Sequence, residues 1–190
     1  MPKSNLFLGL AAAAATLAAS ATIAASPSPA KTVMVGGAAM YPTRTIVENA
    51  VNSKDHTTLV AAVKAAGLVE TLSGPGPFTV FAPTNAAFAK LPKGTVETLL
   101  KPENKAMLQS VLTYHVVAGR LTAADLMRQI RAGGGVATLT TVQGGKLSAR
   151  MVGTSVVLTD AKGGRARVTQ ADVLQSNGVI HVTDNVSLPG

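Results

Sequence analysis

The spacing of hydrophobic and polar positions changes near the middle of this chain. In residues 57–66 (TTLVAAVKAA) and 103–113 (ENKAMLQSVLT), apolar side chains recur about every 3.6 residues, which predicts two amphipathic helices. Gly67 directly follows the first segment and is a typical helix stop. Shorter helices are predicted over residues 45–51, 86–91, 95–100 and 122–131.

After residue 135, short runs rich in β-branched residues alternate with tight connections that contain glycine. The predicted strands cover residues 136–142, 146–151, 155–160, 165–173 and 179–182, and an earlier one covers 78–81. The connections QGG, VGT and AKGG favour antiparallel hairpins. Because helices come first and strands follow, the sequence predicts the α+β class rather than α/β.

The first residues have the pattern of an export signal. Lys3 precedes an apolar run over residues 6–19, small residues follow, and a Pro-Ser-Pro segment then stops any helix. We predict a signal peptide over residues 1–25, with an uncleaved N-terminal anchor as the alternative. Residues 26–40, rich in Ser, Pro, Gly and Ala, are predicted to be a flexible linker. One domain is then expected over residues 41–190, in a secreted or periplasmic protein.

Composition narrows the expected partners. The chain has no cysteine, so it forms no disulfide and has no site for the lipid anchor of a bacterial lipoprotein. After the leader, no apolar run is long enough to span a membrane. Removing Lys3 with the leader leaves 16 basic and 9 acidic residues, a net charge of 16 − 9 = +7. This charge favours anionic partners, or simply keeps the surface solvated. Six aromatic residues (two Tyr, four Phe) and no Trp offer no stacking platform for nucleic acid.

Candidate catalytic and metal-binding groups are sparse. The three histidines, His56, His115 and His181, are far apart in sequence, and no metal-ligand spacing joins them to a carboxylate. The chain contains no Gly-x-Ser-x-Gly elbow, and its Gly-rich segments lack the Lys-Ser/Thr of a phosphate-binding loop. The sequence therefore predicts no enzyme, no cofactor and no metal site.

Three segments together resemble the fasciclin domain family. They are GPFTVFAPTNAAF (Gly76–Phe88), YHVV (Tyr114–Val117) and SNGVIHVTDNVSLP (Ser176–Pro189), in the order and at the spacing of that family. The resemblance covers about residues 41–190. It implies an antiparallel β-wedge or small sandwich packed against several short helices. It also implies an extracellular or cell-surface module that mediates adhesion by binding proteins or glycans, without catalysis.

The resemblance also points to individual residues. In animal members an Asp-Ile pair and a Tyr-His motif are implicated in integrin binding, and the matching positions here are Asp172-Val173 with Leu174, and Tyr114-His115. Val173 replaces Ile, and Gln170-Ala171 replaces the usual Asn-Lys. We expect Asp172 to be exposed at a strand end. His115 follows an apolar helical stripe. The alternative to a binding role is therefore a structural one, in which its buried imidazole joins helix to sheet.

The predicted partner is an extracellular or cell-surface protein or an acidic glycan. Asp172 and the basic residues Lys162, Arg165 and Arg167 form the predicted binding face. Two alternatives stay open. The domain could carry or sense a small apolar ligand held between helices and sheet, or it could hydrolyse a substrate with His115 or His181.

Overall fold

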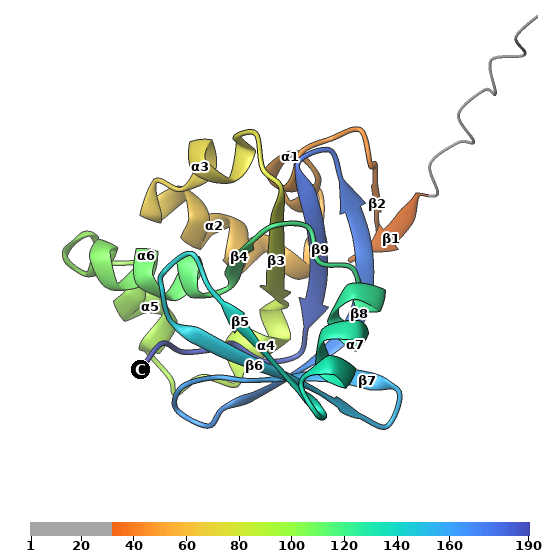
Figure 1. Ribbon diagram of the computed structural model, residues 1–190. Coiled ribbons are helices and arrows are strands. Elements are labelled where there is room, and N and C mark those ends of the chain that lie inside the picture. The colour runs from red at the N-terminus through yellow and green to blue at the C-terminus, as the bar shows by residue number, and fades with distance from the viewer. Residues whose placement is uncertain (1–31) are drawn as a thin grey trace, which may run out of the picture.

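A strongly curved seven-stranded sheet forms the centre of the computed structural model, which describes residues 32–190 (Figure 1). Its strands follow the order β4-β3-β9-β8-β7-β6-β5. Their bounds are β3 Phe78–Pro83, β4 Val116–Ala118, β5 Val136–Thr140, β6 Lys146–Val152, β7 Ser155–Thr159, β8 Arg165–Gln175 and β9 Gly178–Thr183. The predicted signal peptide, residues 1–25, and the first part of the predicted linker lie outside the described residues.

The two edges of this sheet approach each other. Val117 of β4 forms an isolated antiparallel bridge with Thr141, just after β5. The backbone amide of Val142 also donates a 2.7 Å hydrogen bond to the carbonyl of Val116. These contacts nearly close the sheet into a barrel, which limits the unpaired edge available to other chains.

Strand pairing follows the predicted hairpins, with one exception. From β5 to β9, consecutive strands pair antiparallel, as their glycine connections predict. One pair departs from the predicted antiparallel arrangement, because β3 and β9 pair in parallel, with Phe78 opposite Gly178. Parallel neighbours need a long crossover between them, and here most of the domain supplies it.

Most of the helices cover one side of β3 and β9, and the last one, α7, covers the inside of the curved sheet (Figure 1). They are α1 Ile46–Ala50, α2 Thr57–Ala66, α3 Val69–Ser73, α4 Asn85–Ala89, α5 Thr95–Leu99, α6 Lys105–Tyr114 and α7 Ala123–Ala132, with single 3₁₀ turns at Lys54–His56 and Pro102–Asn104. A left-handed Gly67 (φ 72°) ends α2 as predicted. Thr84 caps α4 by accepting a hydrogen bond from the amide of Ala87. The helical predictions are confirmed, and α3 is an addition to them.

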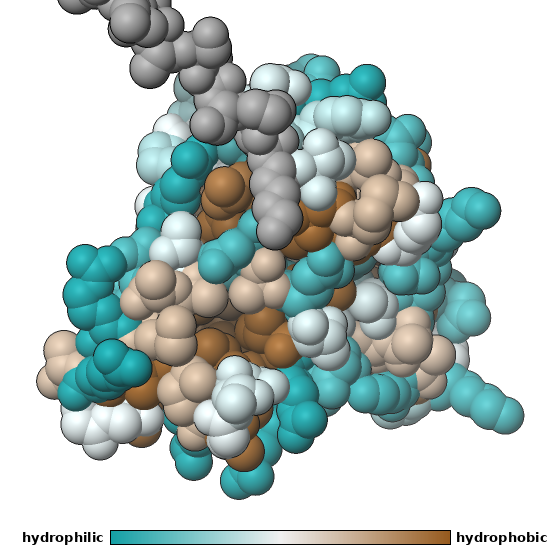
Figure 2. Space-filling view, turned by 90° about the vertical axis from the view of Figure 1, so that its right-hand side faces the viewer, coloured by the Kyte–Doolittle hydropathy of each residue, from teal (hydrophilic) through white to brown (hydrophobic). Residues whose placement is uncertain are grey.

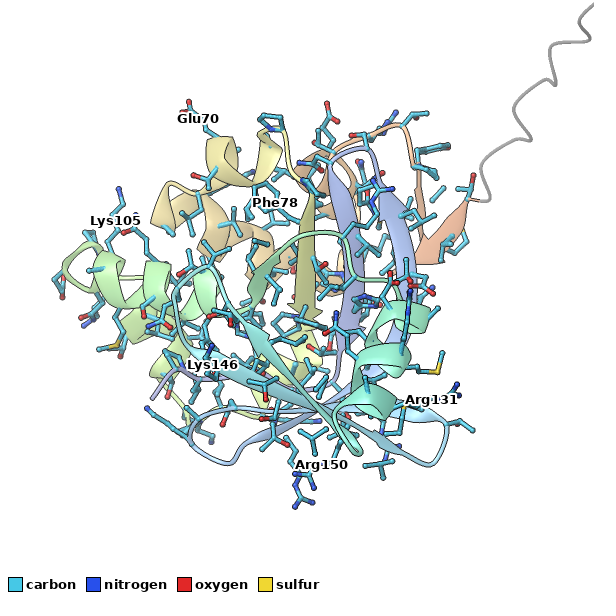
Figure 3. The ribbon with its side chains drawn as sticks, in the orientation of Figure 1. Glu70, Phe78, Lys105, Arg131, Lys146 and Arg150 are labelled. Atoms are coloured by element: carbon cyan, nitrogen blue, oxygen red, sulfur yellow. The ribbon has the colours of Figure 1, made fainter. Side chains whose placement is uncertain are left out.

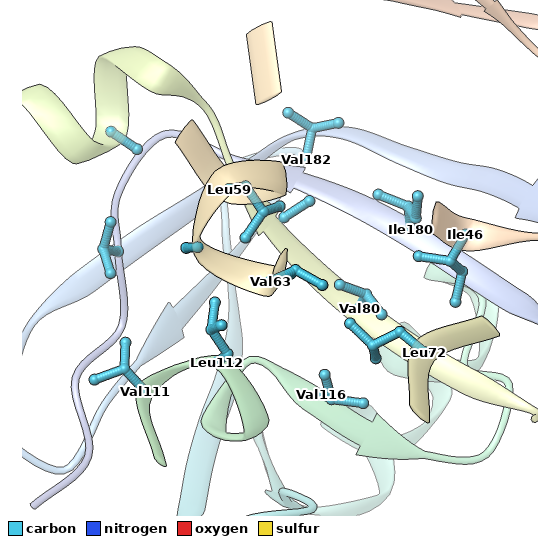
Figure 4. Packing of buried hydrophobic residues seen from close by; sticks show 14 of the residues in the cluster. Ile46, Leu59, Val63, Leu72, Val80, Val111, Leu112, Val116, Ile180 and Val182 are labelled. Atoms are coloured by element: carbon cyan, nitrogen blue, oxygen red, sulfur yellow. The ribbon is translucent and has the colours of Figure 1, made fainter. Parts of the chain in front are cut away.

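Buried apolar side chains form two clusters on either side of the β3–β9 pair. The first lies between these strands and helices α1, α2, α3 and α6, where Leu59 and Val63 of α2 face Val80 of β3 (Figure 4). The second fills the inside of the curved sheet beneath α7, and its largest members are Phe81, Tyr114, Leu126, Leu147 and Leu158. The mixed α+β class predicted from the sequence is confirmed.

Part of the predicted linker, residues 33–40, is a β-hairpin. β1 (Val33–Val35) and β2 (Ala38–Met40) form an antiparallel hairpin. Gly36 and Gly37 both have positive φ (56° and 75°), as a tight two-residue turn requires. Val35 and Met40 are buried in the first cluster. The flexible linker expected over residues 26–40 is therefore wrong for residues 33–40, because their apolar side chains pack against the domain.

Candidate functional site

The outer face of β6, β7 and β8 presents arginine side chains in a regular row. Strand register places Arg150 of β6 opposite Val157 of β7, and Val157 opposite Arg167 of β8. Two strand spacings separate the arginines by about 10 Å between Cα atoms. Arg165 lies two residues before Arg167 and therefore points to the same face. The alternating burial of β8 in this segment agrees, with Ala166 and Val168 buried on the inner side.

These side chains border a shallow groove of about 270 Å³. Its lining comprises Arg150, Val152, Val157, Arg165, Arg167 and Asp184. Figure 3 shows the Arg150 side chain extending away from the body of the protein, and Lys146 on the same strand. A groove bordered by arginines that are free to form bidentate hydrogen bonds is suited to carboxylate, sulfate or phosphate groups.

Two carboxylates near this face, Asp160 and Asp184, accept hydrogen bonds from backbone amides and form no ion pair with its arginines, although Asp184 also lines the groove. Asp160 is buried and accepts hydrogen bonds from the amides of Lys162, Gly164 and Leu188 at 2.7–3.0 Å. The Oδ1 atom of Asp184 accepts from the amide of Arg167 at 2.8 Å. Each carboxylate thus fixes a turn or strand end.

The basic residues of the same segment point to solvent. They are Lys146, Arg150, Lys162, Arg165 and Arg167, and all are exposed. Within residues 32–190 the structure has one ion pair, between Arg128 and Asp125 on α7, so none of these five side chains is in an ion pair there. The predicted basic residues Lys162, Arg165 and Arg167 are thus surface residues of one strand and its preceding turn. Arg150 completes their group, and sequence reasoning missed it.

Asp172 lies within β8 and is less exposed than predicted. Its carboxylate Oδ1 accepts a 2.7 Å hydrogen bond from the amide of Ala123, the first residue of α7. The residue is only half-exposed and has a positive φ of 57°. Asp172 therefore anchors the start of α7 to β8, where the helix dipole favours a negative charge.

Val173 and Leu174, which were also predicted to contact a partner, lie on opposite faces of β8. Val173 is 1% exposed and packs in the first apolar cluster, whereas Leu174 is 40% exposed. Successive residues of a strand point to opposite faces, which places these two on different sides. Of these two apolar side chains, only that of Leu174 is exposed to solvent.

The Tyr-His motif lies inside the protein. The Tyr114 hydroxyl donates a 2.6 Å hydrogen bond to the carbonyl of Lys146 and accepts a 3.1 Å bond from the amide of Ala161. Tyr114 is fully buried, and His115 is 3% exposed. Neither side chain is therefore accessible at the surface, and the predicted burial of His115 is confirmed.

Hydrogen bonds occupy both ring nitrogens of His115 and of His181. The backbone amide of Ser187 donates to His115 Nε2 at 3.0 Å, so Nδ1 bears the proton and donates to the carbonyl of Val111 at 2.7 Å. In His181, Nδ1 accepts from the amide of Asp172 at 3.3 Å and Nε2 donates to the carbonyl of Leu121 at 2.7 Å. Burial lowers the pKa of both imidazoles, because it disfavours the charged form.

This arrangement weighs against the hydrolytic alternative. A general base needs a ring nitrogen within reach of a substrate proton, and both imidazoles are committed to structural bonds. His181 is also stacked on Phe81, with 5.6 Å between ring centroids. Among the described residues, no three His, Cys, Asp or Glu side chains gather in a way that could hold a metal ion.

One side of the molecule has a hydrophobic surface region. Figure 2 shows hydrophobic side chains gathered in the middle of one side of the molecule, with hydrophilic side chains around them. In the part of the chain from residue 32 onward, none of the helices combines the length and the apolar character needed to cross a membrane.

Comparisons with known proteins agree with this architecture. The family model described as "Fasciclin domain" matches residues 54–189. Protein sll1483 of Synechocystis sp. is 51% identical over 160 residues, which cover 84% of this chain and 81% of that protein. The immunogenic protein MPB70 of Mycobacterium bovis is 34% identical over 208 residues, covering 100% of this chain and 99% of that protein.

A solved structure has a similar fold. It is a FAS1 domain pair from the insect cell adhesion molecule Fasciclin I, with a TM-score of 0.68 and 19% sequence identity. The match covers 75% of this chain and 50% of the domain pair. At this identity the similarity extends to the fold alone.

Proposed function

This chain belongs to the fasciclin domain family, and we propose that it acts outside the cytoplasm as a non-catalytic binding domain for an acidic polymer. The binding face comprises Arg150, Arg165 and Arg167 on the outer side of β6–β8, with Lys146 and Lys162 at its margin. The observation that carries the proposal is this row of exposed cations, none of which is in an ion pair within the described residues.

Three further observations support this assignment. The solved insect domain pair with the same fold comes from a cell adhesion molecule. The leader-like pattern of residues 1–25 would deliver the domain to that environment. The two histidines proposed for hydrolysis are fully hydrogen-bonded, so the chemistry of the site favours binding over turnover.

An acidic polysaccharide fits the groove better than an acidic protein. The three arginines are spread over about 10 Å of the outer surface of the sheet, which suits a chain with repeated carboxylates or sulfates. Exposed charge pairs of this kind are weakened by salt, since the screening length is about 10 Å at 0.1 M ionic strength. Binding should therefore fall steeply as the salt concentration rises.

The test compares binding of the mature protein to alginate, an acidic polysaccharide, and to dextran, a neutral one. We expect saturable binding to alginate and none to dextran. Replacing Arg150, Arg165 and Arg167 together by Gln should weaken alginate binding at least about tenfold. The matched control replaces three exposed lysines of the helical half, Lys93, Lys101 and Lys105, and removes the same net charge.

The lysine variant distinguishes binding at the arginine face from a general attraction of the positively charged protein to alginate. If both triple variants lose the same affinity, overall charge accounts for binding and the proposed face is wrong. If alginate does not bind at all but an extracellular protein does, the domain is an adhesion module for protein and the polysaccharide proposal is wrong. Hydrolysis of either polymer would contradict the non-catalytic assignment.

A further inference from the structure

The connection from β8 to β9 contains a chemically reactive pair of residues, Asn177 and Gly178. Ser176 and Asn177 form the turn, and Gly178 begins β9. Asn177 is the only asparagine in the sequence that precedes a glycine. In such a pair the backbone nitrogen of the glycine can attack the side-chain amide of the asparagine, because glycine has no Cβ atom to hinder the approach. The connection is therefore a site at which the chain can lose ammonia, a reaction that makes asparagine thermolabile.

The folded structure binds both ends of the Asn177 amide group. Its Oδ1 atom accepts a 3.0 Å hydrogen bond from the backbone amide of Ile46, the first residue of α1. Its Nδ2 atom donates to the carbonyl of Leu72 in α3 at 2.8 Å and to that of Gly74, just after this helix, at 3.0 Å. Asn177 is 9% exposed. The side chain thus joins the start of α1 to the end of α3, and its amide group can move only if three hydrogen bonds break.

The attacking nitrogen is enclosed as well. Gly178 is buried, and it pairs with Gln175 of β8 and with Phe78 of β3. The backbone amide of Phe78 donates a 3.0 Å hydrogen bond to the carbonyl of Asn177. A Cβ atom on Gly178 would lie 2.1 Å from the carbonyl oxygen of Phe78, so the backbone has little room to rotate there. The reaction therefore requires the β8–β9 turn to open first.

The reaction consumes only water. The Gly178 nitrogen loses its proton to hydroxide and forms a bond to Cγ of Asn177. The Cγ–Nδ2 bond breaks, and the departing nitrogen takes a proton from water and leaves as ammonia. Water then opens the resulting cyclic imide at either of its carbonyl carbons, which gives aspartate or isoaspartate. The rate should rise with pH, because the attacking nitrogen must be deprotonated.

Both products conflict with the contacts of residue 177. An aspartate keeps an acceptor for the Ile46 amide, but its second oxygen replaces Nδ2 and faces the carbonyl oxygens of Leu72 and Gly74. A mostly buried charge beside two acceptors is costly, because no donor compensates its loss of hydration. Isoaspartate lengthens the main chain between β8 and β9 by one carbon atom, which displaces the carbonyl that Phe78 binds.

We propose that Asn177 is a latent modification site. The folded domain protects its amide group, whereas a domain that has opened at the β8–β9 turn loses ammonia there. The aspartate or isoaspartate that forms then prevents the return to the native structure, so a single opening can become permanent. This site goes beyond the proposed polymer-binding face and shares no residue with it, so each proposal succeeds or fails without the other.

The first test compares the loss of ammonia in the folded and the unfolded protein at pH 8. Trypsin releases residues 168–190 as one peptide, because no lysine or arginine follows Arg167, and tandem mass spectrometry locates the change at Asn177. We expect Asn177 to react at least about a hundredfold faster in guanidinium chloride than in buffer, since three hydrogen bonds protect it in the fold. Asn52 is exposed and its side chain makes a single hydrogen bond, so it is the internal control and should be accelerated less than about tenfold.

The second test asks whether the modified chain can refold. Protein held in guanidinium chloride at pH 8 for increasing times is diluted into buffer, and far-UV circular dichroism measures the refolded fraction. This fraction should fall in proportion to the modified fraction of Asn177. Protein held in the same denaturant at pH 5, where the glycine nitrogen keeps its proton, should refold fully after dilution into the same buffer.

A pair of variants isolates the aspartate product. Asn177→Asp should lower the midpoint of chemical unfolding, whereas Asn52→Asp adds the same charge at an exposed position and should leave the midpoint unchanged. If Asn177→Asp does not fold at all while Asn52→Asp does, the proposal is supported in the same way.

Three results would overturn the proposal. If Asn177 reacts at the same rate in the folded and the unfolded protein, its hydrogen bonds do not protect it. If the modified chains refold like unmodified ones, the modification has no structural consequence. If Asn177→Asp unfolds at the same denaturant concentration as the wild type, the contacts of residue 177 do not exclude the product.

Discussion

The Nε2 atom of His115 accepts a 3.0 Å hydrogen bond from the backbone amide of Ser187, 72 residues later in the chain. This bond attaches the C-terminal segment to the end of α6, and it requires a neutral imidazole. Burial lowers the pKa of His115, as it does for His181 and His56. The same residue that the family resemblance suggests for partner binding thus holds two distant segments together.

Folding stability should therefore fall as the pH drops below about 6.5, the ordinary pKa of histidine. A lowered pKa in the folded state means that the unfolded chain binds more protons in this range, so the free energy of unfolding increases with pH. Each buried histidine contributes up to about 1.4 kcal/mol per pH unit. Urea unfolding at pH 5, 6, 7 and 8 measures this slope. His115→Gln should reduce it, and a slope equal to that of the wild type would contradict the role of this imidazole.

Asp172 should matter for stability through the start of α7. Asp172→Ala removes the acceptor of the Ala123 amide and places alanine at a left-handed φ of 57°, so we expect a loss of about 2 kcal/mol. Asp172→Asn keeps an acceptor and tolerates that conformation, so it should stay within about 0.5 kcal/mol of the wild type. Chemical unfolding measures both. Alginate binding should be the same in Asp172→Asn and the wild type. Weaker alginate binding by Asp172→Asn would show that Asp172 is part of the binding face.

The β1–β2 hairpin should behave as part of the domain. Met40 is 3% exposed within the first apolar cluster, so Met40→Ala should lower the free energy of unfolding by about 2–4 kcal/mol. Met34 on the same hairpin is 59% exposed, and Met34→Ala is the matched control with an expected change below about 0.5 kcal/mol. Equal, small effects of the two variants would mean that residues 33–40 are dispensable, as a linker would be.

Gly178 permits the close approach of β9 to β3. A Cβ atom at this position would lie 2.1 Å from the carbonyl oxygen of Phe78 in the parallel partner strand. Gly178→Ala should therefore force the strands apart and cost about 3 kcal/mol or more in thermal or chemical unfolding. Ser176→Ala, two residues earlier at an exposed position, is the control and should have little effect. A mild Gly178→Ala phenotype would show that the parallel pair can shift.

Local periodicity was enough to locate most elements of this fold. The apolar stripe of Leu108, Val111 and Leu112 predicts α6, and Gly67 marks the end of α2, because helix spacing and left-handed caps are properties of a few neighbouring residues. The glycine connections after residue 142 predict the antiparallel strands for the same reason. The hairpin at residues 33–40 has a similar sequence signal, Gly36-Gly37 between short apolar runs. The Ser, Pro, Gly and Ala content of residues 26–40 led to the prediction of a linker there instead.

The binding residues depended on contacts between distant segments. The alternation of Lys146, Ser148 and Arg150 predicts an exposed face of β6, but only strand register aligns Arg150 with Arg167 across β7. The parallel pairing of β3 with β9 and the reach of Asp172 to Ala123 likewise leave no periodic trace in the sequence.

The elements, the α+β class, the basic charge and the family resemblance can all be predicted from the amino-acid sequence. Each of these is a property of local spacing or of composition. Which side chains are accessible depends on the folding of the whole domain, which buries Tyr114, His115 and Val173 and directs Asp172 toward the start of α7. Burial and pairing are set by the packing of segments far apart in the chain, so no local pattern encodes them.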